Sequence, residues 1–177
     1  MTAEPSARLT QIVDAARELL ESQGPGGLTM RALAERLGMR APSLYKHVAD
    51  KDELEALLIA EALREQGAEM HEAIADLASR SSRKAKLAAL ARAYRAWALS
   101  HPHLYRLVTG GVLPRERLPD GLEAWAAQPV IVAAGTEPRA RATWAFAHGM
   151  TILELDGRFP PGADLDAAWH EGIAAFG

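Results

Sequence analysis

Residues 29–48 read TMRALAERLGMRAPSLYKHV, and this stretch decides how the rest of the chain is interpreted. Thr29 can cap a short helix, and Gly38 can end that helix in a tight turn. Pro42 stands in the first turn of a second helix, running to about Val48, where proline is tolerated because the amide there has no partner within the helix. Two short helices joined by a tight turn predict a helix-turn-helix, whose second helix is offered to the major groove of DNA.

Charge is distributed unevenly around this stretch. The chain has 20 Lys and Arg against 23 Asp and Glu, a formal net charge of −3. Residues 1–27 sum to −2 and residues 28–51 to +3, so the remaining residues sum to −4. A basic island in an acidic chain favours a local contact with a polyanion. On charge alone, a solvated surface of mixed charge is the simpler interpretation.

The composition excludes several classes of protein. It is 49% hydrophobic and 24% charged, as in soluble globular proteins, and it contains no cysteine for disulfides or thiolate metal sites. No apolar run reaches the roughly 18 residues of a membrane-spanning helix. Met1–Pro5 does not resemble the start of a secretion signal. We therefore expect a cytoplasmic protein with no membrane partner.

The residue patterns of enzymes and metal sites are not found either. Of six histidines only His101 and His103 are close neighbours, and Pro102 between them disfavours a shared helical face. The glycine-rich run 24–27 lacks the Lys and Ser or Thr of a phosphate-binding loop. No Gly-x-Ser-x-Gly nucleophile motif is present. We expect no enzyme, no catalytic residue, no metal site and no cofactor.

Elsewhere, Gly and Pro separate stretches in which apolar residues recur at helical spacing. Between Gly110 and Gly135, three prolines leave only short helices or loops. No strand signal rises above noise, so we predict an all-α fold. Its further helices run from Ser6 to about Ser22, from the Asp50–Glu53 capping box toward Leu77, around 87–97, over about 137–156 and from Leu165 to Phe176.

The sequence Leu-Tyr-Lys-His-Val-Ala-Asp-Lys over residues 44–51 resembles the N-terminal domain of the tetracycline-repressor (TetR) family. The resemblance extends over about residues 8–58 and implies the family's mode of DNA binding. Arg31 would reach a base edge, since an arginine can bond O6 and N7 of guanine together. The positions that the resemblance and the exposed face of the second helix assign to DNA are Thr29, Arg31, Arg40, Ala41, Pro42, Ser43, Tyr45, Lys46, His47 and Lys51.

The chemistry of these residues suits the roles that the resemblance implies. Tyr45, His47 and Lys51 match positions that contact phosphates. Thr29 and the free amides at the start of its helix also suit a phosphate. The alanine and proline that open the second helix offer only apolar contact to a thymine methyl. For Tyr45 alone, a buried tyrosine that packs the helices together is an equally good interpretation.

The segment Trp144-Ala-Phe-Ala-His-Gly149 resembles the Trp/His-Gly signature of one TetR-family effector domain, the WHG type. Residues 101–107 resemble a segment common in that group. Such domains are similar in having a helical pocket for a small ligand and a dimer interface made mainly by the last two long helices. Large side chains among many alanines could line a pocket, and an ordinary core accounts for each of them equally well. The predicted ligand-binding residues are Trp97, Leu104, Tyr105, Val108, Trp144 and His148.

Two features of the C-terminal half favour close helix packing. Gly149 and Gly172 stand inside predicted helices, where glycine costs about 1 kcal/mol against alanine, so a close helix approach is the simplest reason for them. The last helix also has one strongly apolar face. We expect a second copy of the chain to bury part of that face, which is formed by Leu165, Trp169, Ile173 and Phe176.

With a joint at Ser79–Ser82, the sequence predicts three parts. These are a helix-turn-helix domain over 1–50, a connecting helix over 51–78, and an effector-binding and dimerisation domain over 79–177. The predicted function is a homodimeric transcriptional regulator, a repressor that a small-molecule effector releases from a palindromic double-stranded DNA operator. The alternative is a helical small-molecule-binding or protein-interaction module without DNA binding, which would show no salt-dependent DNA affinity.

Overall fold

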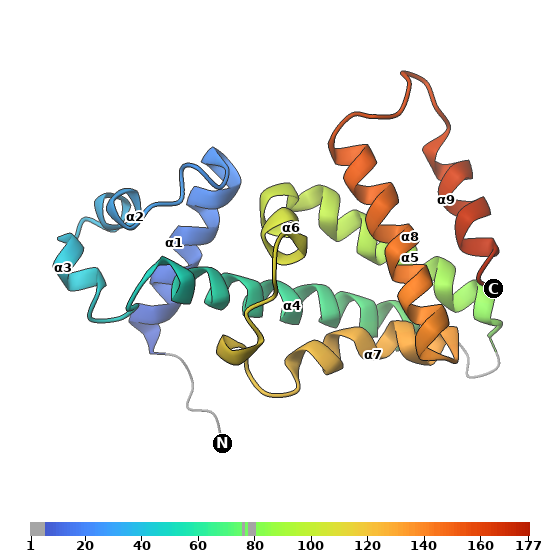
Figure 1. Ribbon diagram of the computed structural model, residues 1–177, viewed down its shortest axis with the longest axis horizontal. Coiled ribbons are helices and arrows are strands. Elements are labelled where there is room, and N and C mark those ends of the chain that lie inside the picture. Colours follow the sequence, from blue (N-terminus) through green and yellow to red (C-terminus); the bar gives the residue numbers. More distant parts are fainter. Residues whose placement is uncertain (1–5, 76, 78–80) are drawn as a thin grey trace. The chain divides into compact units, whose positions relative to one another are not determined.

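The computed structural model describes residues 6–75, 77 and 81–177, and within them helices are the only regular secondary structure (Figure 1). The predicted all-α fold is confirmed. None of the helices so described is long and apolar enough to cross a membrane. Met1–Pro5, together with Ser79 and Arg80 of the predicted joint, lies outside the described residues.

The chain forms two compact units. Unit 1 comprises Met1–Ala62 and His101–Asp120, and unit 2 comprises Leu63–Ser100 and Gly121–Gly177. Each unit therefore contains two separate stretches of the chain. The three parts predicted from the sequence follow chain order instead, and that functional division remains a prediction.

Unit 1 holds the helices that resemble a DNA-reading domain. Ser6 caps the first of them as predicted, because its Oγ accepts a hydrogen bond from the Leu9 amide at 3.2 Å. The core of the unit is built from fully buried aliphatic side chains of several helices, including Ile12, Leu33 and Leu44. Its elements are α1 (Ala7–Gln23), α2 (Met30–Arg36), α3 (Ala41–Leu44), the first half of α4 (Lys51–Ala75), α6 (Pro102–Thr109) and the 3-10 turn η1 (Arg115–Arg117).

The predicted capping box fixes the start of α4. Asp50 Oδ1 accepts the Glu53 amide at 2.7 Å, and Glu53 Oε2 accepts the Ala49 amide at 2.5 Å. The second bond reaches the residue before the cap rather than the cap itself, so the box is a shifted version of the usual one. The Ala49 and Glu53 amides are thereby satisfied by side chains at this helix end, and α4 begins at Lys51.

Helix α6 belongs to unit 1 because it is tied to α1. The Glu21 carboxylate accepts the Leu104 amide at 2.8 Å and the His103 amide at 3.3 Å. These amides lie in the first turn of α6, where backbone donors lack partners within the helix and a negative charge is favoured. The side chains of Leu104 and of Tyr105, the next residue, are fully buried.

Unit 2 surrounds α5 (Arg83–Ser100), which packs against α7 (Leu122–Ala134), α8 (Glu137–Leu155) and α9 (Leu165–Ala174). The helical periodicity predicted its inner face correctly, because Leu87, Leu90, Tyr94 and Trp97 are all buried. The predicted helices over 137–156 and from Leu165 are confirmed as α8 and α9.

The expectation of only short helices or loops between Gly110 and Gly135 is wrong, because α7 is a 13-residue helix with Pro129 inside it. Proline has no amide to offer the carbonyl four residues earlier, which belongs to Trp125. The His71 ring of α4 replaces that donor, since its Nε2 lies 3.0 Å from the Trp125 oxygen and its ring stacks on the indole at 4.8 Å. Gly67 lets the two helices meet, because a Cβ there would lie 2.6 Å from the Trp125 ring.

The packing of α9 within its own chain accounts for part of its apolar face. Trp169 is 6% exposed and Ile173 3% exposed, both covered by this chain's own helices, whereas Leu165 and Phe176 of the same face are half-buried. Burial of the face by a second copy remains a prediction. The close approach predicted at Gly172 is confirmed, because a Cβ there would overlap the Phe146 ring. At Gly149 a Cβ would meet no atom within 4 Å, so none of the described helices explains that glycine.

Gly172→Ala should lower the free energy of unfolding by about 1–3 kcal/mol, because the added methyl must displace a ring that is packed on both sides. The Phe146 ring meets Trp169 edge-on at 5.8 Å and Phe176 at 5.9 Å, which limits its freedom to move. Urea denaturation of the wild type and the variant measures the change. In a Phe146→Ala background the methyl has space, so the same substitution should cost nothing or stabilise. An equal loss in both backgrounds would show that the ring is not the cause.

Candidate functional site

The helix-turn-helix of unit 1 is held by local hydrogen bonds that the sequence predicted. Thr29 Oγ1 accepts the Ala32 amide at 3.1 Å and caps α2. Gly38 takes a φ of +63°, a left-handed conformation that side-chain-bearing residues rarely adopt. The Met39 amide then bonds the Ala34 carbonyl at 3.0 Å and closes the turn. The direction in which α3 leaves α2 is therefore fixed by backbone geometry.

The second helix is shorter than predicted, because α3 ends at Leu44 and not near Val48. The Leu44 carbonyl accepts the amides of both His47 at 2.9 Å and Val48 at 3.2 Å, so the chain tightens into a turn. Leu44 and Val48 are both buried and anchor the two ends of this turn. Asp50 must cap α4 two residues later, which leaves no room for a longer α3.

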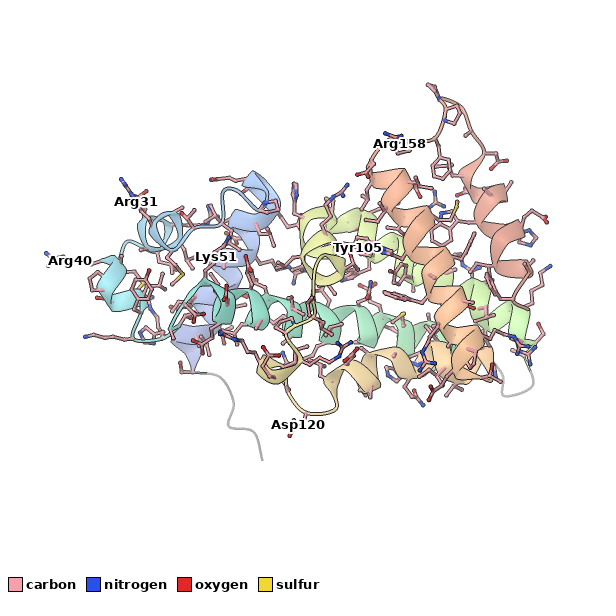
Figure 2. All side chains as sticks on the ribbon, viewed as in Figure 1. Arg31, Arg40, Lys51, Tyr105, Asp120 and Arg158 are labelled. Atoms are coloured by element: carbon pink, nitrogen blue, oxygen red, sulfur yellow. The ribbon has the colours of Figure 1, made fainter. Side chains whose placement is uncertain are left out.

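The ten predicted DNA-binding residues all lie in unit 1 and all reach solvent. Figure 2 shows the Arg31 and Arg40 side chains extending away from the ribbon at the α2 and α3 end of the unit. Tyr45 is 50% exposed, so the interpretation of this residue as a buried packing tyrosine is wrong. Ala41 and Ser43 are half-buried, and the exposed members are Thr29, Arg31, Arg40, Pro42, Tyr45, Lys46, His47 and Lys51.

Two of the cations at this surface already have partners. Arg31 Nε lies 2.9 Å from Glu35 Oε1, and this hydrogen bond raises the pKa of Arg31 above its usual value. Lys51 Nζ lies 3.2 Å from Glu55 Oε1. Exposed pairs of this kind contribute little to stability and exchange easily for another anion. The surface therefore carries several cations, two of which are balanced by carboxylates of their own helices.

One residue at this surface was missed by sequence reasoning. Arg117 of η1 places its Nη1 3.1 Å from Asp50 Oδ1, the oxygen that caps α4. The Glu53 amide and, to a smaller extent, the Arg117 guanidinium hold the pKa of Asp50 below its usual value. The two partners stand 67 residues apart, and no local pattern in the sequence could have paired them.

The six predicted ligand-binding residues fall into both units. Leu104, Tyr105 and Val108 lie on α6 in unit 1, where the first two are fully buried. The remaining three lie in unit 2, and the structure brings two of them together, because the Trp144 and His148 rings stack at 5.7 Å. Partial burial lowers the pKa of His148. The set therefore remains a prediction; its unit 2 members are Trp97, Trp144 and His148.

Unit 2 also has a groove that sequence reasoning did not predict. It lies between α5 and α9 and has a volume of about 510 Å³, within the range of small-ligand sites. Its walls are mostly apolar, and Arg92, Arg95 and His170 supply its basic groups. Arg95 is already bound by Glu154 at 2.7 and 2.9 Å. None of the six predicted ligand-binding residues lines this groove.

In the described part of the chain, no three His, Asp or Glu side chains gather closely enough to hold a metal ion.

Two family models match the chain. One, for bacterial regulatory proteins of the tetR family, covers residues 12–56. The other, for the tetracyclin repressor-like C-terminal domain, covers residues 87–176. Together they span both the helix-turn-helix and most of the C-terminal helices.

Individual proteins agree with these models. The chain is 32% identical over 121 residues to the HTH-type transcriptional regulator Mb1846 of Mycobacterium bovis, a match that covers 68% of this chain and 51% of that protein. The chain thus spans about half the length of this curated relative. A protein with unknown function from Rhodococcus sp. RHA1 shares the fold, with a TM-score of 0.81, 21% identity and coverage of 99% and 96%.

A further solved structure is that of a TetR variant from Acinetobacter baumannii AYE in complex with minocycline. Its TM-score to this chain is 0.68, with 25% identity, and the match covers 94% of this chain and 92% of that one. Because one model alone covers half of the residues and the helix-turn-helix matches a second, the chain belongs to the TetR family of bacterial regulatory proteins.

Proposed function

We propose that the chain is a DNA-binding transcriptional regulator, a repressor that a small-molecule effector releases from its operator. The observation that carries the proposal is the helix-turn-helix, which presents exposed arginine, lysine, tyrosine and histidine side chains from one short segment of unit 1. A helix and turn of this kind fit the major groove, and flanking cations bind phosphates. The proposal includes no catalytic step, and a regulator of this kind acts in the cytoplasm, where its DNA lies.

The alternative function, a helical ligand-binding or interaction module without DNA affinity, leaves these features unexplained. A hairpin that serves only for packing does not need an exposed tyrosine such as Tyr45. Nor does it need Arg40 and Lys46, which take part in none of the ion pairs found among the described residues. Binding to short duplexes over a range of salt concentrations separates the two functions. A regulator loses affinity steeply as salt rises, because its phosphate contacts release counterions. A module without DNA affinity shows no binding at any salt.

We further propose that the effector acts by shifting populations. Two copies of the recognition helix must match successive major grooves of a palindromic operator, so a small change in their spacing weakens binding. An effector that binds more tightly to the state with the mismatched spacing would shift the population toward that state. The size of the shift is set by the difference between its affinities for the two states. Support for an effector comes from the resemblance of residues 87–176 to the tetracyclin repressor-like C-terminal domain. The Acinetobacter baumannii relative is solved with minocycline, a small molecule of the kind expected here.

For the homodimer, we propose an interface on the outward face of α8. Of the last two helices, α8 offers a second copy a better surface than α9. The first half of this face carries the small residues Ala145 and Gly149, and the second half carries the bulky Leu153, which is 42% exposed. Arg141 and Asp156 lie near opposite ends of the face. Two copies of α8 crossing in opposite directions near Gly149 would fit small against bulky and basic against acidic. α9 would support this face from within its own chain.

Arg31→Ala should cost about 1–3 kcal/mol of binding free energy on the preferred duplex and relax the preference at one base pair. The reason is that Arg31 stands at the start of α2 with an exposed guanidinium that pairs with Glu35. The preferred duplex is obtained by selection from a random library, and competition with single-base variants measures the preference. Equal weakening on preferred and random duplexes would make Arg31 a phosphate contact instead.

Lys51→Gln should weaken binding to all duplexes alike and lower the salt dependence by about one unit per subunit, because one phosphate contact is lost. The Lys51 ammonium lies at the first turn of α4, where free amides also favour an anion. Fluorescence anisotropy titrations at several salt concentrations give the slope. Lys84→Gln, which removes an exposed lysine from α5 in unit 2, serves as the matched control and should leave the slope unchanged.

Charge reversal tests the α8 pairing. Arg141→Asp alone and Asp156→Arg alone should each weaken self-association by more than about tenfold, because like charges then meet twice in each dimer. An equal mixture of the two variants should recover full affinity, since every contact is again between opposite charges. Sedimentation equilibrium without DNA measures the dimer in each case.

Glu171→Arg on the exposed side of α9 is the control for this experiment and should leave the dimer intact. Loss of the dimer in this control would place α9 in the interface. A wild-type chain that sediments as a monomer, or a mixture that does not recover, would refute the α8 arrangement.

A further inference from the structure

The start of α4 poses an electrostatic problem for DNA binding. Residues 50–55 read Asp-Lys-Asp-Glu-Leu-Glu, four carboxylates against one lysine, which sums to −3. Carboxylates near a helix N-terminus stabilise the helix, but they repel a phosphate that approaches the same amides. Glu55 also engages Lys51 directly at 3.2 Å. A phosphate contact at Lys51 therefore needs a positive charge from outside the helix.

η1 supplies that charge. Arg117 Nη1 lies 3.1 Å from Asp50 Oδ1, the same oxygen that accepts the Glu53 amide at 2.7 Å. The side chain of Arg117 is 38% exposed and that of Asp50 is 52% exposed, so the pair stands at the surface next to Lys51 and not in the core. An exposed ion pair of this kind contributes little to folding stability. The ion pair has a larger effect on the attraction of an approaching anion, because Arg117 neutralises a negative charge at the first turn of α4.

We propose that Arg117 is a positioning residue for DNA binding, which neutralises the capping carboxylate Asp50 so that Lys51 and the start of α4 can receive a phosphate. The inference rests on the proposed function and deepens it, since it adds a residue outside the helix-turn-helix to the DNA-binding surface. Arg117 acts through Asp50 and does not itself contact the phosphate. The residue comes from the segment between α6 and α7, so the part of the chain that leads into unit 2 tunes the affinity of unit 1 for DNA.

The test is a double-mutant cycle on DNA affinity. The probe is a short random-sequence duplex, because a phosphate contact is independent of sequence, and anisotropy gives the dissociation constant of the full chain. Arg117→Gln should weaken binding by about tenfold at low salt, since one uncompensated carboxylate per subunit then faces the phosphates. Asp50→Asn keeps a side-chain acceptor for the Glu53 amide but carries no charge. In that background Arg117→Gln should have almost no effect.

Two further readouts separate neutralisation from direct contact. The salt slope should be unchanged in Arg117→Gln, because no phosphate contact is lost, whereas a fall of about one unit per subunit would overturn the inference in favour of direct contact. Arg117→Lys should restore affinity, since it restores the charge. Thermal unfolding should be nearly the same in all variants, and a large drop for Arg117→Gln would make the pair a structural element only.

Arg115→Gln is the matched control, because it removes the same charge from the same turn without a contact to Asp50 among those that the structure shows. Its effect should be clearly smaller than that of Arg117→Gln. Equal effects of both, not rescued by Asp50→Asn, would overturn the proposal and indicate a general cationic loop. A wild-type chain that binds no duplex would refute the proposed function itself, whereas normal binding by Arg117→Gln would refute this inference alone.

Discussion

The hydrogen bonds from the first amides of α6 to the Glu21 carboxylate are the contact on which unit 1 depends. Helix starts offer unpaired amides, and a carboxylate from another helix satisfies them and favours the local dipole. Glu21 accepts two such amides, at 2.8 and 3.3 Å, and the fully buried Leu104 and Tyr105 complete the attachment. As a result the stretch from His101 to Asp120 joins the helix-turn-helix, and η1 comes within reach of the start of α4.

In unit 2, a comparable role falls to Arg95. Its guanidinium binds Glu154 of α8 at 2.7 and 2.9 Å and Asp166 of α9 at 2.5 Å, and it stands 5.7 Å from the Trp169 ring centre. The hydrogen bonds that Arg95 donates to Glu154 are the main reason why the pKa of Arg95 is raised above its usual value. One side chain of α5 thereby holds both α8 and α9. This attachment helps to explain why Trp169 and Ile173 of α9 are buried within their own chain.

How much the sequence could predict depended on how far apart the interacting residues stand. Caps and turns within a few residues, such as Ser6, Thr29, Gly38 and the Asp50–Glu53 box, were predicted correctly because their chemistry is local. α7 was missed because the donor that replaces the lost proline amide comes from His71, which stands 54 residues before the Trp125 carbonyl that it serves. The Asp50–Arg117 pair lay beyond prediction for the same reason. The end of α3 was misplaced by a few residues because the next cap, and not helix propensity, decides where it stops.

The divided makeup of unit 1 has a consequence for how the protein is made. During synthesis α1 to α3 and the first half of α4 leave the ribosome well before α6, which begins only at Pro102. Until then Glu21 has no partner in α6, and the apolar surface of α1 that α6 covers remains open to water or to a chaperone. The helix-turn-helix therefore reaches its finished state only after about two thirds of the chain exists. In a nascent chain that stalls within α5, the sequence of the helix-turn-helix would be complete, but α6, which packs against α1, would still be missing.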